Sequence, residues 1–134
     1  VLGTNMSFRL EQAEKTGVGH NMIFDSYWPG GTRNTAWWKN VTGLLTEVAS
    51  ARIASPIFID PSELRGGGKG FPEYGRRSNF PSPWPGGWWR LRDIVEYELS
   101  SMASILETAA QKMRSLTHRS RRNFKLVRAE RQNL

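Results

Sequence analysis

A stretch from position 60 to position 87 restricts the fold most, because it is unsuited to regular secondary structure. It contains five prolines, and four of the five residues 66–70 are glycine. Proline removes a backbone hydrogen-bond donor, and glycine in an element costs conformational entropy. Phe71, Phe80 and Trp84 lie in the same stretch, although aromatic residues are scarce in disordered segments. We therefore expect a long loop that packs against the rest of the protein.

The pattern of apolar residues predicts helices on either side of this loop. After the loop, apolar residues recur every three or four positions and predict an amphipathic helix from about 88 to 115. The residues of this stripe are Leu91, Ile94, Val95, Met102, Ile105, Leu106, Ala109 and Met113. A second, basic helix is expected over 118–131. A short helix is expected over 5–16, ended by Gly17 and Gly19.

Three short apolar runs predict extended structure. They cover positions 22–24, 41–49 and 57–59. Glu47 interrupts the second run, where strand alternation would place it on one face with Leu45 and Ala49. A carboxylate in an apolar strand costs free energy unless it is solvated, paired or functional. Composition and periodicity alone indicate a chain rich in helix with little strand.

The net charge of +7 is concentrated at one end of the sequence. Residues 1–111 hold 11 basic and 11 acidic side chains, whereas residues 112–134 hold eight basic side chains and one acidic one, Glu130. Such a segment typically binds a partner rich in phosphate or an acidic membrane surface. A solvated helix end, where cations are favourable, is the simpler explanation. No apolar run approaches the roughly 20 residues needed to cross a bilayer.

Other motifs predict little chemistry. His20 and His118 have no metal-ligating partner at helical spacing, so no metal site is predicted in this chain. The glycines at 66–70 lack the spacing of a phosphate-binding loop. The pairs Trp37–Trp38 and Trp88–Trp89 fit either a stacking platform or, more commonly, a core or an interface.

Two longer segments resemble a known family. Residues 24–50 read FDSYWPGGTRNTAWWKNVTGLLTEVAS, and residues 79–110 read NFPSPWPGGWWRLRDIVEYELSSMASILETAA. Together they resemble the end of the catalytic domain of zinc carboxypeptidases of the carboxypeptidase A type. More specifically, they resemble the large bacterial members of this family that are expected to be secreted. In these, an aromatic-Asp-Ser-Tyr-aromatic-Pro-Gly segment precedes a strand that ends in Thr-Glu-x-Ala-Ser.

The resemblance implies an α/β fold. It implies a partial mixed-sheet domain in which this chain supplies the last one or two strands, the long aromatic loop and a long C-terminal helix. Residues 1–116 would be the C-terminal portion of the catalytic domain, and residues 117–134 a basic helical tail. The sparse apolar content, the start at Val1 and the long helix agree with a piece of a longer protein.

The resemblance also implies roles for individual residues. Glu47 matches the general base that activates a zinc-bound water and passes the proton to the departing amine. Tyr27 matches the tyrosine of a mobile lid, and Tyr27 and Arg33 are the candidate substrate-binding residues. The zinc ligands of the family, a His-x-x-Glu pair and a later His, have no counterpart in this sequence. Zinc is therefore expected in the full-length parent and not in this chain alone.

The implied function is hydrolysis of C-terminal peptide or amide bonds by the parent, with this chain inactive alone. Its partners would be a peptide substrate and the missing N-terminal part of the catalytic domain, in a periplasmic or secreted protein. Nucleic acid is not an expected partner. The alternative is a non-catalytic subunit with a basic tail, structural or associated with nucleic acid, in a larger assembly.

Overall fold

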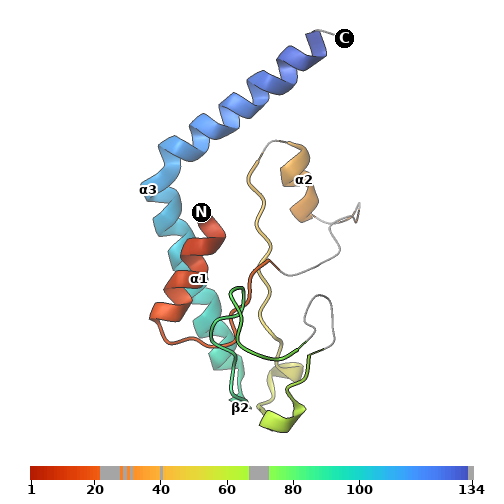
Figure 1. The fold of residues 1–134 in the computed structure, drawn as a ribbon, viewed down its shortest axis with the longest axis vertical. Coiled ribbons are helices and arrows are strands. Elements are labelled where there is room, and N and C mark those ends of the chain that lie inside the picture. Colours follow the sequence, from red (N-terminus) through yellow and green to blue (C-terminus); the bar gives the residue numbers. More distant parts are fainter. Residues whose placement is uncertain (22–27, 29, 31, 40, 67–72, 133–134) are drawn as a thin grey trace. The chain divides into compact units, whose positions relative to one another are not determined.

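The computed structural model describes residues 1–21, 28, 30, 32–39, 41–66 and 73–132 and shows a small mixed α/β protein (Figure 1). These residues form three α-helices, two short 3-10 helices and one two-stranded antiparallel sheet. The chain divides into two compact units. The first unit comprises Val1–Phe24 and Glu47–Leu106, and the second comprises Asp25–Thr46 and Glu107–Leu134.

Helix α1 spans Leu2–Gln12, slightly earlier than the sequence predicts. It ends before the expected glycines because the backbone N–H of Lys15 donates a 2.9 Å hydrogen bond to the carbonyl of Leu10. Glu14 supplies the left-handed residue of this helix end, with φ of 55°. Leu10 is only 5% exposed, so this end of the helix is also its anchor in the first unit.

The sheet pairs two segments that are distant in sequence. Strand β1 spans Ile57–Ile59 and strand β2 spans Gly87–Trp89, with Ile57 opposite Trp89. The predicted extended structure at 57–59 is confirmed. The prediction that Trp88 and Trp89 begin a helix is wrong, because these residues pair with β1 instead.

Helix α3 spans Leu91–Gln132 as one helix, where the sequence predicts two. It begins directly after β2, where the carboxylate of Asp93 accepts a 2.8 Å hydrogen bond from the backbone N–H of Arg90. This bond satisfies a backbone donor at the helix start. In the first unit, α3 packs on α1 (Figure 1). The helix continues without a break through the boundary predicted between 115 and 118.

The described part of the aromatic loop packs against the first unit, as expected. Phe80 is 3% exposed, and its ring makes an edge-to-face contact with Tyr74 at 5.5 Å between centroids. The Tyr74 hydroxyl donates a 2.7 Å hydrogen bond to the carbonyl of Trp84. The backbone N–H of Gly17 donates to the carbonyl of Ser82 at 2.6 Å. The loop is thus held by its own aromatic residues and by the segment that follows α1.

The predicted strand at 41–49 is wrong, because residues 41–50 carry no regular secondary structure. An apolar run becomes a strand only when another strand supplies its backbone partners, and no described segment pairs with this one. The extended run predicted at 22–24 lies outside the described residues. Helix α2, Thr32–Trp38, was not predicted.

Candidate functional site

The candidate catalytic residue Glu47 is exposed. It lies in an open segment between α2 and the 3-10 helix Arg52–Ala54. No described side chain or backbone group makes a hydrogen bond or ion pair with it. Its carboxylate is therefore accessible to solvent and to a ligand.

The chain next to Glu47 is tied to the aromatic residues of the first unit. The indole N–H of Trp89 donates a 2.8 Å hydrogen bond to the carbonyl of Ala49. The Trp89 ring makes edge-to-face contacts with Trp84 and Tyr97, at 5.8 and 5.4 Å between centroids. The sequence left open whether the Trp88–Trp89 pair serves a core or a ligand, and the structure gives Trp89 the packing role. Trp88 is 53% exposed.

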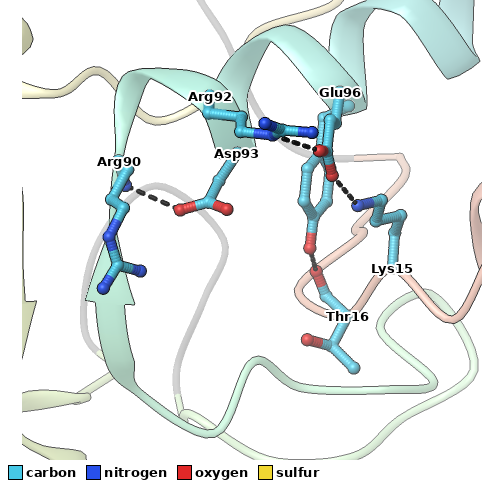
Figure 2. A network of polar contacts seen from close by, with 7 residues as sticks. Lys15, Thr16, Arg90, Arg92, Asp93 and Glu96 are labelled. Carbon is cyan, nitrogen blue, oxygen red and sulfur yellow. Dashed lines mark hydrogen bonds and ion pairs between the residues drawn. The ribbon is translucent and has the colours of Figure 1, made fainter.

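A polar network at the start of α3 adds to this packing (Figure 2). The Tyr97 hydroxyl donates a 2.7 Å hydrogen bond to the carbonyl of Thr16. The ammonium of Lys15 lies 2.8 Å from the carboxylate of Glu96 and 5.3 Å from the centre of the Tyr97 ring. Arg92 pairs with the same carboxylate at 3.0 Å. No sequence pattern predicts these contacts, since Lys15 and Glu96 are 81 positions apart.

This network shifts two titrating groups in opposite directions. The hydrogen bond from Lys15, followed by the one from Arg92, lowers the pKa of Glu96. Burial raises the pKa of Tyr97, and the hydrogen bond with Thr16 opposes this rise. Both groups link α3 to the segment after α1, so they act on stability rather than on the accessible carboxylate of Glu47.

The two other predicted site residues are not brought to Glu47 by the described part of the structure. Tyr27 lies outside the described residues. Arg33 lies in α2, but its side chain lies outside the described ones. The predicted substrate-binding pair therefore stays a prediction.

The described side chains do not fit a zinc ion. No three His, Asp or Glu side chains among them lie close enough together to hold a metal. His20 lies in the loop after α1, where its backbone N–H donates to the carbonyl of Asn79 at 3.0 Å. His118 is exposed on α3. No reaction step in this chain is therefore assigned to zinc.

Comparisons with models of protein families, with curated proteins and with solved structures find no match to this chain. Among the described residues, no helix combines the length and the apolar character needed to cross a membrane. The local geometry of Glu47 is an exposed carboxylate on a segment that is tethered at Ala49.

Proposed function

We propose that this chain is the C-terminal portion of a zinc-carboxypeptidase-like catalytic domain, in which Glu47 is the general base. The reaction is hydrolysis of the C-terminal peptide or amide bond of a peptide, with Tyr27 and Arg33 contacting the substrate. The metal ligands would lie in a part of the protein outside this chain, and the whole would act in the periplasm or outside the cell. The observation that carries the proposal is the exposed Glu47 carboxylate on an anchored but unpaired segment.

The unpaired backbone around Glu47 supports the proposal that part of the sheet is supplied from outside this chain. Among the described residues, 42–48 make no backbone hydrogen bond. This run contains Leu44, Leu45 and Val48, which favour strands when a neighbouring strand is present. Unpaired β-prone backbone readily accepts another strand. A sheet from the N-terminal part of the domain would provide that partner and would make this run one of the last strands of a mixed sheet.

The apolar face of α3 supports the same conclusion. Large side chains on the part of this helix in the first unit are 43–68% exposed, namely Leu91, Val95, Leu99, Met102 and Leu106. They follow one another at spacings of three or four residues and therefore share one face. Phe58 and Trp88 of the sheet are exposed as well. A monomeric protein rarely leaves so many large apolar groups in water, so a further part of the domain is expected to cover them.

A pair of matched variants in the longer protein tests the proposal. Glu47→Gln keeps the size of the side chain but removes the base, and we expect kcat for release of a C-terminal residue to fall at least about 10²–10⁴-fold. Glu98→Gln, which removes an exposed carboxylate on α3, is the control and should leave kcat unchanged. Normal turnover by Glu47→Gln, with normal folding and bound metal, would rule out the assigned role.

A further inference from the structure

The C-terminal half of α3, residues 112–132, carries all of the net charge of the protein. It is helical throughout. Its cations are Lys112, Arg114, Arg119, Arg121, Arg122, Lys125, Arg128 and Arg131, against Glu130. Arg121 and Arg122 are exposed and make no ion pair with any described side chain. Eight positive charges on a helix of about 30 Å form a strong local field that requires an anionic partner or solvent.

The same half-helix also has apolar positions on one face. At 100° per residue, four apolar residues fall within an arc of about 80° and four cations within a separate arc of about 60°. The apolar positions are Met113, Leu116, Phe124 and Val127, and the cationic ones are Arg114, Arg121, Lys125 and Arg128. Arg131 is the one cation that falls within the apolar arc. Residues 113–128 are therefore amphipathic as well as basic, a combination typical of helices that lie in a membrane interface.

The rest of the second unit adds exposed tryptophans. Trp28 and Trp38 are 62% and 68% exposed, and Lys39 beside Trp38 is exposed too. Tryptophan is enriched where apolar and polar phases meet, because its ring is apolar and its N–H remains hydrated. Exposed tryptophans and an amphipathic basic helix in one unit point to the same kind of surface.

From these observations we infer that the second unit binds the surface of an anionic lipid bilayer through the C-terminal half of α3. The helix lies in the plane of the headgroups, with its cations at the lipid phosphates and carboxylates and its apolar positions at the acyl boundary. A nucleic-acid backbone would match the cations but would leave the apolar positions in water. A bilayer satisfies both. This inference is independent of the role proposed for Glu47.

Co-sedimentation of this chain with lipid vesicles tests the inference. We expect binding to phosphatidylcholine vesicles that contain about 30% phosphatidylserine and at least about tenfold weaker binding to phosphatidylcholine alone. Raising the salt from about 0.05 M to about 0.5 M should weaken the binding further, because it screens the surface charge. Equal binding to both kinds of vesicle, or no binding to either, would overturn the inference.

Two variants separate the charge and the apolar contributions. Arg121→Gln with Arg122→Gln removes two cations and should weaken binding by about 30-fold, at about 1 kcal/mol for each. The control, Arg52→Gln with Arg65→Gln, removes two exposed cations of the first unit and should bind like the parent. Phe124→Gln should also weaken binding while the helical circular dichroism signal stays the same.

Nucleic acid is the competing ligand, and one further measurement distinguishes it from an anionic bilayer. We expect a duplex or single-stranded oligonucleotide of about 20 nucleotides to bind more weakly than the anionic vesicles at equal salt. Tighter binding to the oligonucleotide would show that this half of α3 recognises phosphate polyanions rather than a bilayer. Full binding to vesicles by Phe124→Gln would overturn the placement of the apolar positions at the acyl boundary.

Discussion

The indole N–H of Trp89 and the carbonyl oxygen of Ala49 are joined by a 2.8 Å hydrogen bond across 40 positions in the sequence. Through this bond, the segment that carries Glu47 is attached to the aromatic residues packed beside α3. Trp89 is itself fixed by edge contacts with Trp84 and Tyr97. The backbone two residues after Glu47 therefore has a defined anchor, although its own segment lacks regular structure.

Replacement of Trp89 by Phe is expected to destabilise the first unit. The variant loses the hydrogen bond to Ala49 and part of two edge contacts, which together correspond to about 1–3 kcal/mol in the free energy of unfolding. The measurement is urea unfolding followed by circular dichroism. Trp88→Phe is the matched control: Trp88 is largely exposed and its contact with Phe58 survives in the variant, so a change below about 0.5 kcal/mol is expected. Equal losses for both variants would contradict the anchoring role.

Local patterns predicted several of the observed elements. Ile57–Ile59 is a short β-branched and aromatic run between prolines, and it forms β1. The apolar stripe that follows the loop predicted most of the first half of α3. The loop prediction also holds for most of the stretch that the structure describes, since proline and glycine disfavour helix and strand, although a 3-10 helix spans Pro61–Glu63 and Gly87 begins β2.

The remaining features depend on contacts between distant residues, which one sequence does not reveal. Trp88 and Trp89 continue the helical spacing of α3, but pairing with β1 makes them a strand. The run at 41–49 has strand propensity without a described partner, and propensity alone does not form a strand. For the candidate site, Glu47 was singled out as a carboxylate in an apolar run and given its role by resemblance, whereas its link through Ala49 to Trp89 appears only in three dimensions.

Gly17 is expected to tolerate no side chain. Its φ is +77°, a conformation that costs other residues about 1–2 kcal/mol, and an added Cβ would lie 2.9 Å from the Cβ of Trp84. Gly17→Ala should therefore lower the free energy of unfolding by at least about 1–2 kcal/mol. Gly75→Ala is the control, because a Cβ there meets nothing within 4 Å. That variant should be neutral or slightly stabilising. A Gly17→Ala protein with the same free energy of unfolding as the parent would contradict the close approach of Trp84.

The pair of Lys15 and Glu96 predicts a loss of stability in acid. The hydrogen bond from Lys15 is the largest cause that holds the pKa of Glu96 below its usual value of 4.5. The contribution of this pair to the free energy of unfolding is therefore complete above the pKa that Glu96 has in the unfolded chain. It is lost as the pH falls through the lower pKa that Glu96 has in the folded protein. Glu96→Gln should remove this part of the pH dependence, measured by unfolding between about pH 3 and pH 7. Glu98→Gln should retain it, and the same acid profile in both variants would disprove the assignment.

Tyr97 predicts the opposite behaviour in alkali. Burial raises its pKa above 10.0 in the folded protein, despite the hydrogen bond that its hydroxyl donates to Thr16. As the pH rises, the unfolded chain therefore releases the Tyr97 proton before the folded protein does. The contribution of Tyr97 to the free energy of unfolding is complete below its pKa in the unfolded chain and falls as the pH rises through its higher pKa in the folded protein. Tyr97→Phe has no proton to release, but it lacks the hydrogen bond and should be about 0.5–1.5 kcal/mol less stable at neutral pH. The difference between the two proteins should narrow as the pH approaches about 11, as measured by urea unfolding at each pH. Tyr74, whose pKa is raised by burial and to a lesser extent by the charge of Tyr97, remains in both proteins. A difference that stays constant from neutral to alkaline pH would show that Tyr97 ionises equally easily in the folded and unfolded chain.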